Sequence, residues 1–289
     1  MATRSANLPI IRTAGGAERD PVAYGRRQQA LRIGLGIGVP VALLLLWQVS
    51  AVQGWINRFD YPAPTDIVAK TREVFQDNPS GNMWLDVSAS GRRLLLGYLW
   101  GSLFGLAAGV AMGMSRYLRY AFEPMTNALY TVPKLALIGV FLIIFGFDDT
   151  PIVALIAVTV FFFVWIQTLA AVLSVSDNLR EAAKSFGAKR RHMFRHVLLP
   201  ASLPGIFVGL RLAAGVAVLT VIGVELVFTP GNPPRGVGYR INNARQILDP
   251  PQAYVGLFVA AIMGVLFTVA VKYVGRLLMP WAPSDNSVS

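Results

Sequence analysis

The sequence predicts an all-α polytopic membrane protein with six transmembrane helices. Of its 289 residues 54% are hydrophobic and 14% are charged, a balance outside that of soluble domains. Apolar stretches of the roughly 20 residues that a spanning helix needs recur along the chain. Lys and Arg residues gather in alternate connecting segments, which is the positive-inside pattern. The net charge of +11 is therefore a topological signature, and no nucleic-acid partner is expected.

The predicted spans leave a polar tail at each end and a basic loop between the fourth and fifth spans. Residues 1–32 are expected to be a disordered cytoplasmic tail, 33–280 the transmembrane domain, and 281–289 a second cytoplasmic tail. On the side of the N-terminus lie 17 of the 26 Lys and Arg residues, so both termini are predicted to be cytoplasmic. The spans are about 33–52, 94–114, 127–147, 151–173, 204–228 and 253–278.

The third span is the weakest of the six. Its uninterrupted apolar part, residues 135–146, is too short to cross alone, so the span must include Pro133 and Lys134. A re-entrant segment that lines protein instead of lipid is the alternative. In the outer segment 53–93, a short amphipathic helix is expected to begin near Thr65 and Asp66. Asp148 and Asp149 are expected to cap the turn before the fourth span.

The basic loop, residues 174–203, predicts two short helices that meet at a glycine. Ser176 or Asp177 can cap the first helix, Gly187 stands where its C-cap belongs, and Pro200 is expected to end the second helix. Such helices either lie on anionic headgroups or dock in a groove of another protein, and the pattern alone leaves both open. The apolar stripe of the first helix consists of Leu179, Ala182, Ala183 and Phe186.

The order of residues in this loop resembles a known motif. Glu181-Ala182-Ala183, three residues, Gly187, nine residues and Val197-x-Leu199-Pro200 is similar to the EAA motif of permease subunits of bacterial ATP-binding-cassette importers, with Val in place of Ile at 197. Segments such as "RRLLLGYLWGSLFGLAAGVAMGMS" and "RGVGYRINNA" look like those of the nitrate, sulfonate and taurine branch of that family.

This resemblance implies a type I importer fold of the MetI-like kind, in which the loop is a cytoplasmic coupling helix. It also implies two ATPase subunits, a second permease copy that forms a homodimer, and an extracytoplasmic binding protein as partners. Small residues of the fifth span, Gly209, Ala213, Ala214 and Gly215, are expected to allow close helix approach in that dimer. The residues expected to contact the ATPase are Leu179, Glu181, Ala182, Ala183, Phe186, Gly187 and Pro200.

No catalytic site is expected in this chain. It lacks a G-x-x-x-x-G-K-[ST] phosphate loop, so ATP and Mg²⁺ are expected on the partner ATPases, and no cofactor is expected on this subunit. His192 and His196 are spaced i, i+4, but "HMFRH" lacks the Glu of a metalloprotease motif, and no metal site is predicted. The chain has no Cys, and therefore no thiolate ligand or Cys nucleophile.

Three polar residues are candidates for the translocation pathway. Lys134 either attracts an anion or snorkels to the cytoplasmic interface. Glu225, at the outer end of the fifth span, is either an interfacial carboxylate or makes a tertiary hydrogen bond that fixes an outer gate. The resemblance marks "RGVGYRINNA", with Arg240, as a short helix that borders the pathway.

The predicted function is that of an importer permease for a small, anionic solute. The alternatives are an ATPase-independent secondary transporter or channel, and an importer of the same class that carries a vitamin precursor such as a pyrimidine. A membrane-embedded hydrolase is not expected, because the spans lack paired acids and the two His residues lie in a cytoplasmic loop.

Overall fold

The computed structural model describes residues 21–76, 82–231 and 234–281, and the regular secondary structure in these ranges is helical apart from one isolated bridge between Gly231 and Pro234. The chain divides into two units, residues 1–65 and 66–289, which are described separately. Residues 1–20 and 282–289, where the terminal tails were predicted, lie outside the described residues.

The first unit contains helix α2 (Pro21–Val52) and the start of α3 (Pro64–Phe75). Helix α2 includes residues 21–32, so the prediction of a disordered tail is wrong for that part. Good helix formers such as Arg, Gln and Ala continue the helix of the apolar span into this polar stretch. The Gln48 amide exchanges hydrogen bonds with the backbone and hydroxyl of Thr65, and α3 begins where the sequence predicted.

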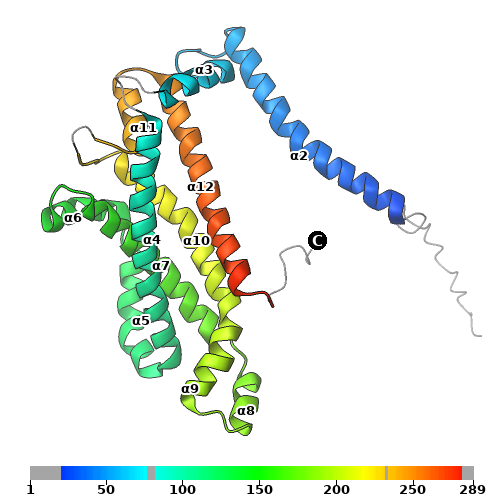
Figure 1. Cartoon of the computed structure of the whole chain (residues 1–289), viewed down its shortest axis with the longest axis vertical. Helices are drawn as coiled ribbons and strands as arrows, with labels where there is room; N and C mark the ends of the chain where they lie inside the picture. Colours follow the sequence, from blue (N-terminus) through cyan, green and yellow to red (C-terminus); the bar gives the residue numbers. More distant parts are fainter. Residues whose placement is uncertain (1–20, 77–81, 232–233, 282–289) are drawn as a thin grey trace, which may run out of the picture. The chain divides into compact units, whose positions relative to one another are not determined.

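The second unit is a bundle of long helices with short helices at its two ends (Figure 1). Helices α8 and α9 lie at one end, and α11 lies at the opposite end (Figure 1). A 3₁₀ turn covers Lys134–Leu137, and a π-helical turn covers Phe194–Leu198. The remaining helices are α4 (Met83–Met114), α5 (Arg116–Tyr130), α6 (Ile138–Phe145), α7 (Thr150–Leu173), α8 (Asp177–Ser185), α9 (Arg190–Met193), α10 (Leu199–Glu225), α11 (Val237–Gln246) and α12 (Pro250–Leu278).

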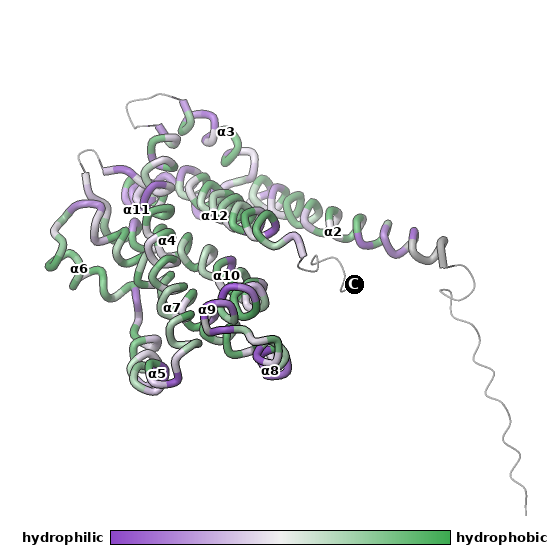
Figure 2. The backbone as a smooth tube through the Cα atoms, turned by 60° about the horizontal axis from the view of Figure 1, so that its bottom comes forward, coloured by the Kyte–Doolittle hydropathy of each residue, from purple (hydrophilic) through white to green (hydrophobic). Residues whose placement is uncertain are grey.

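Five described helices are long and apolar enough to cross a membrane. They are 28–52, 83–114, 150–173, 191–225 and 250–278, and Figure 2 shows the apolar residues along them and the hydrophilic residues of α8. The second span begins earlier than predicted, at Met83 instead of residue 94, because the Asn82 side chain caps the helix by accepting from Trp84 N at 2.9 Å.

The predicted third span, residues 127–147, is not one continuous helix. Helix α5 ends at Tyr130, the chain turns at residues 131–133, and the apolar helical stretch that follows covers only Lys134–Phe145. Pro133 explains the break, because a proline disfavours the helical conformation of the residue before it. The count of six spanning helices is therefore not confirmed.

The chain between α4 and α7 must nevertheless return from one end of the bundle to the other. Gly97 near the middle of α4 faces Ile156 in the first half of α7, and Gly113 at the end of α4 faces Val172 at the end of α7. The two helices are thus parallel neighbours, so residues 115–149 traverse the length of the bundle as a broken path of α5, the 3₁₀ turn and α6.

A row of glycines lets α4 and α7 approach closely. Their spacing of four residues places all of them on one face of α4. A Cβ atom at Gly109 would lie 2.6 Å from Thr168 Cβ and 2.8 Å from the Trp165 carbonyl oxygen of α7. These distances are below any real carbon contact, so the interface requires glycine. The row consists of Gly97, Gly101, Gly105, Gly109 and Gly113.

The hydrophobic core of the second unit is formed by α4, α7 and α10. It includes Leu94, Ile156, Val160, Leu210 and Val221. Tyr98 donates a hydrogen bond from its hydroxyl to the Leu210 carbonyl at 3.0 Å and so ties α4 to α10.

Three of the four small residues predicted at a dimer interface serve this core instead. Ala213 and Ala214 are fully buried within the chain, and a Cβ atom at Gly209 would collide with Gln167 of α7. These three residues are not available to a second copy. Gly215 meets open space in this chain.

We expect Gly109→Ala to destabilise the protein by about 1–3 kcal/mol, because the added Cβ overpacks the α4–α7 contact. Gly91→Ala is the matched control on the same helix. A Cβ atom there meets nothing within 4 Å, so the better helix propensity of Ala should stabilise it by about 0.5–1 kcal/mol. Thermal unfolding in detergent measures both, and equal melting temperatures for the two variants would contradict the close packing.

Candidate functional site

The loop between α7 and α10 forms the two helices that the sequence predicts, joined by a left-handed glycine. Gly187 has φ of +76°, Gly187 N donates to the Lys184 carbonyl at 2.8 Å, and Ala188 N donates to the Ala183 carbonyl at 3.0 Å. This pair of bonds is a Schellman motif, whose left-handed residue is usually glycine. The predicted C-cap role of Gly187 is confirmed. We call residues 177–198 the coupling segment, after the role that the sequence predicts for them.

Most of the residues predicted to contact the ATPase are exposed, whereas Ala183 and Pro200 are partly buried. The Phe186 side chain is 91% exposed, and Leu179, Glu181 and Ala182 are also exposed. A large aromatic ring held in water at a fixed turn is unfavourable for the isolated chain. The arrangement suits a surface that another molecule covers.

The second helix does not end at Pro200 as predicted. Helix α9 passes through the π-helical turn Phe194–Leu198 directly into α10, where Leu199 N donates to the Phe194 carbonyl. The wider π turn accommodates Pro200, which lacks an N–H and would collide with the carbonyl four residues earlier in an α-helix. Pro204, predicted as the first residue of the span, lies inside α10. The coupling segment is therefore continuous with α10.

The coupling segment is also bound to the end of α7. The Arg180 guanidinium donates to the Val172 carbonyl at 2.9 Å, one of the carbonyls that a helix end leaves without an intrahelical partner. Between α8 and α9 lies a groove of about 470 Å³, which is lined in part by Phe186, Lys189 and His192. The segment thus contacts both spans that it connects.

The two histidines of the coupling segment stack on one another. The rings of His192 and His196 lie 4.1 Å apart between centroids, with 21° between their planes. Among the described residues no group of three His, Cys, Asp or Glu side chains could hold a metal ion.

At the opposite end of the bundle, a buried ion network joins α4, α7, α10 and α11. Arg93 Nη1 donates to Glu225 Oε1 at 2.6 Å and to the Arg235 carbonyl at 2.8 Å. Its Nε donates to Asp149 Oδ1 at 2.8 Å. One guanidinium on α4 therefore holds the start of α7, the end of α10 and the loop before α11.

The same network fixes the backbone at the start of α11. Asp86 forms an ion pair with Arg240 and accepts from Gly236 N at 3.0 Å. Ser90 donates its hydroxyl to the Glu225 carboxylate and accepts from Val237 N at 2.9 Å. A Cβ atom at residue 236 would lie 2.6 Å from the Glu225 carboxyl carbon, so the loop approaches this closely only because residue 236 is glycine.

The charged members of this network are hidden from solvent, apart from Asp149, whose side chain is 29% exposed. Asp86, Arg93, Glu225 and Arg240 are each at most 5% exposed. Buried charges are expensive unless they are paired and hydrogen-bonded, and here two carboxylates face two guanidiniums with backbone N–H donors around them. Of the two alternatives that the sequence left open for Glu225, the structure supports the tertiary hydrogen bond and not the interfacial carboxylate. Glu225 and Arg240 point toward protein groups in this chain.

Sequence reasoning missed Asp86, Ser90 and Arg93, and it misassigned Asp149. Asp148 does cap α7 by accepting from Thr150 N at 2.8 Å, as predicted, whereas Asp149 makes no side-chain cap and instead pairs with Arg92 and Arg93. Their partners lie 56 to 154 residues away in sequence. The available signal was an acid, a serine and an arginine spaced three to four residues apart ahead of an apolar span.

Lys134 lies at the break between α5 and the 3₁₀ turn. Its ammonium donates to the carbonyls of Leu129 and Tyr130, at the end of α5, and lies 4.9 Å from the Tyr130 ring centroid and 5.2 Å from that of Phe162. A cation at a helix C-terminus is favoured by the helix dipole. Lys134 thus stabilises the end of α5.

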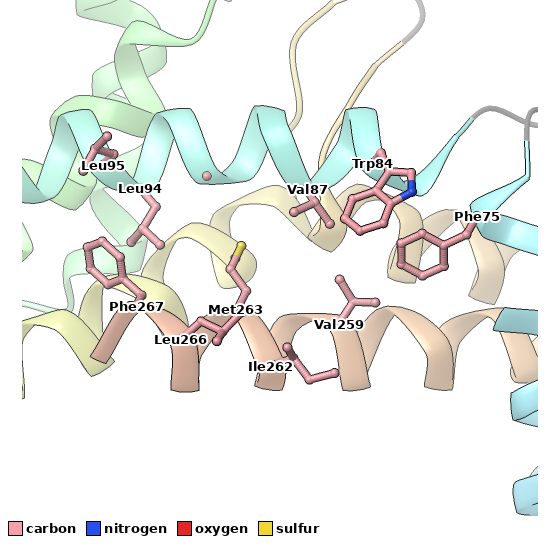
Figure 3. Close-up of a pocket in the computed structure, with 11 residues that line it drawn as sticks. Phe75, Trp84, Val87, Leu94, Leu95, Val259, Ile262, Met263, Leu266 and Phe267 are labelled. Carbon is pink, nitrogen blue, oxygen red and sulfur yellow. The ribbon is translucent and has the colours of Figure 1, made fainter. Parts of the chain in front are cut away.

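An apolar cavity of about 530 Å³ lies between α4 and α12 (Figure 3). The side chains of Trp84, Leu94, Met263 and Phe267 point into it, and Phe75 lies beside Trp84 at one end (Figure 3). A cavity lined in this way offers no cluster of donors to an anion, so it does not have the chemistry of an anion-binding site.

Residues 101–282 match the family described as "Binding-protein-dependent transport system inner membrane component". The chain belongs to this family. A permease protein of Bacillus subtilis named for aliphatic sulfonates transport is 32% identical over 86% of this chain and 88% of its own length. The taurine transport system permease protein of Escherichia coli is 31% identical over 86% of this chain and 90% of its own length.

Two further similarities support the branch and the fold. The nitrate import permease protein of Synechococcus elongatus is 29% identical over 82% of this chain and 86% of its own length. A chain of the MetNI methionine ABC transporter, solved in inward-facing conformations, superposes with a TM-score of 0.59 at 20% identity and covers 70% of this chain and 99% of its own. The predicted importer-permease fold and the resemblance to the nitrate, sulfonate and taurine branch are confirmed.

We expect Arg93→Met to lower the free energy of unfolding by about 3–5 kcal/mol, because it leaves the buried Glu225 carboxylate without its guanidinium. Arg92→Met is the matched control, since the neighbouring Arg92 side chain is exposed and its pair with Asp149 should contribute about 1 kcal/mol or less. Melting temperatures and monodisperse yield in detergent report both changes.

The double variant Arg93→Met/Glu225→Leu removes both buried charges and should recover part of the lost stability. A double variant that is as unstable as the sum of the two single variants would show that Arg93 and Glu225 are not energetically coupled.

Proposed function

We propose that this chain forms the translocation pathway of an ATP-driven importer for a small anion of the sulfonate, taurine or nitrate kind. The observation that carries the proposal is that relatives named for these three solutes each match more than four fifths of the chain at about 30% identity. Sulfonates and nitrate share a trigonal arrangement of oxygens that carries negative charge at neutral pH. The solute is expected to arrive on a separate binding protein.

The partners follow from the same class of transporter. We propose two ATPase subunits, which bind ATP and Mg²⁺, and a second copy of this permease. The permease itself binds no cofactor in this scheme, and its contribution is the pathway and the contact through which ATPase closure moves it. We further propose that both termini and the coupling segment are cytoplasmic, because Lys and Arg residues concentrate on that side.

The coupling segment is the contact we assign to the ATPase. Its exposed Phe186, beside the left-handed Gly187, is suited to anchor in an apolar groove of a partner, while Ala182 and Ala183 allow close approach. Glu181 and the basic residues that follow supply a polar rim. Leu179 completes the apolar stripe of α8, and Pro200 lies in the first turn of α10, where the segment continues into the span.

We propose that the ion network affects the pathway indirectly, by holding the helices that border it in place. Glu225 and Arg240 fix α11 against α4 and α10, about 40 Å from the coupling segment along the 27 residues of α10. This end of the bundle is then extracytoplasmic. Lys134, at the break in the returning segment, is the proposed cation nearest the solute route.

The reconstituted complex tests the proposed function directly. The permease is co-expressed with the ATPase and binding protein encoded beside it, purified, and placed in proteoliposomes. ATP hydrolysis and uptake of labelled taurine, an alkanesulfonate, nitrate and a pyrimidine are then compared. Uptake of an anion that needs ATP and the binding protein is expected. Uptake that proceeds without an ATPase supports a secondary transporter, and uptake of the pyrimidine alone excludes the anion.

We expect Phe186→Asp to reduce binding-protein-stimulated ATP hydrolysis at least about tenfold, because it places a charge in the apolar contact with the ATPase. Folding should be spared, since the side chain makes little contact within the permease. The control pair Lys189→Gln and Arg191→Gln weakens a headgroup contact without touching the anchor. Normal stimulation with Phe186→Asp, together with loss in the control pair, would instead assign the segment to the membrane surface.

We expect Lys134→Met to lower the rate of anion uptake several-fold and Lys134→Arg to retain most of it, if the positive charge draws the solute into the pathway. The melting temperatures separate this role from the capping of α5, because the Met variant also removes the donor to the Leu129 carbonyl. Parental uptake by a Met variant with a lowered melting temperature would leave Lys134 as a helix cap alone.

A further inference from the structure

The turn between α11 and α12 holds a leucine in a conformation that favours glycine. Leu248 has φ of +56°, and no other described residue except glycines has positive φ. Asp249 N donates to the Ala244 carbonyl at 2.9 Å, which places Leu248 at the left-handed position after the α11 C-cap. A side chain at this position crowds the backbone, so leucine is disfavoured there relative to glycine.

Little packing of the Leu248 side chain against the described residues offsets this strain. It is 70% exposed, and the preceding Ile247 is 58% exposed. Arg245 and Gln246, immediately before them, are exposed as well. Two large apolar side chains with a polar border have the composition of a protein contact centre with its rim.

Two contacts of the Asp249 side chain hold the backbone of this turn. Lys70 Nζ on α3 forms an ion pair with Asp249 Oδ2 at 2.9 Å, and Asp249 Oδ1 accepts from Gln252 N at 3.2 Å at the start of α12. The apolar pair is therefore presented in one orientation. Preorganisation of this kind strengthens binding to a surface of matching shape, whereas insertion among lipid chains does not require a fixed backbone.

The position of the turn in the bundle indicates which protein could bind to it. The turn follows α11, at the end opposite to α8 and α9 (Figure 1). A partner that binds there is not the ATPase, which the coupling segment would contact. The family of this chain is described as binding-protein-dependent, and a binding protein must reach the permease on the side away from the ATPase.

We propose that Ile247 and Leu248 form an apolar contact for the extracytoplasmic binding protein, with the strained backbone of Leu248 retained because it presents that side chain. The inference rests on the proposed function, and it adds a defined docking point at the outer end of the bundle.

The Leu248→Gly variant separates a role in binding-protein contact from a role in stability. It relieves the strain of the left-handed backbone and at the same time removes the apolar side chain. In the reconstituted complex, we expect an equal or higher melting temperature and unchanged basal ATP hydrolysis. The concentration of solute-loaded binding protein that gives half-maximal stimulation should rise about tenfold. Leu248→Met, which keeps an apolar side chain, should stay within about twofold of the parent. Leu248→Asn, which tolerates the left-handed backbone, should resemble the Gly variant.

Three results would overturn the proposal. The first is that the binding protein stimulates ATP hydrolysis by the Leu248→Gly variant as strongly as by the parent. The second is that the variant loses this stimulation but also hydrolyses ATP more slowly without binding protein, which would indicate that Leu248 anchors the turn at the membrane interface. The third is a parental complex that hydrolyses ATP without responding to any binding protein, in which case the proposed function fails with it. A photo-crosslinker at position 248 should join the binding protein, whereas one at position 186 should join the ATPase.

Discussion

The close parallel contact of α4 and α7 is the constraint on which the rest of the bundle depends. Five glycines at every fourth position of α4 remove the side chains that would hold the helices apart. Because the helices are parallel, the chain between them must run back along the bundle. The same contact places the start of α7 beside Arg93, about three turns into α4, which is why Arg93 reaches Asp149 ahead of α7.

The ion network is built where four helix ends meet. Two guanidiniums and two carboxylates are buried there, and a buried ion pair adds little net stability over an apolar pair of the same shape. Its effect is on geometry instead, because each charge has its partner on a different helix and misplaced helices would leave a charge unpaired. Glu225 illustrates this, since it accepts from Ser90 and Arg93 of α4 and from Gly238 N of α11.

Features encoded locally could be predicted from the sequence, and features that depend on distant partners could not. Gly187, the start of α3 and the apolar spans follow from caps, turns and hydrophobic length. The start of α4 was placed 11 residues late because Asp86 and Arg93 look like loop residues until Arg240 and Glu225 neutralise them. The glycine row is visible in the sequence as a four-residue repeat, but only the partner helix α7 shows what it is for.

The contacts at the two ends make α7 and α10 a single mechanical element. At one end the coupling segment joins them, with Arg180 bound to the α7 terminus and the π turn carrying the helix past Pro200 into α10. At the other end Arg93 holds Asp149 before α7 and Glu225 at the end of α10. Sliding α7 along α10 would break contacts at both ends, so under the proposed function a push on the coupling segment would be resisted as shear and transmitted as tilt.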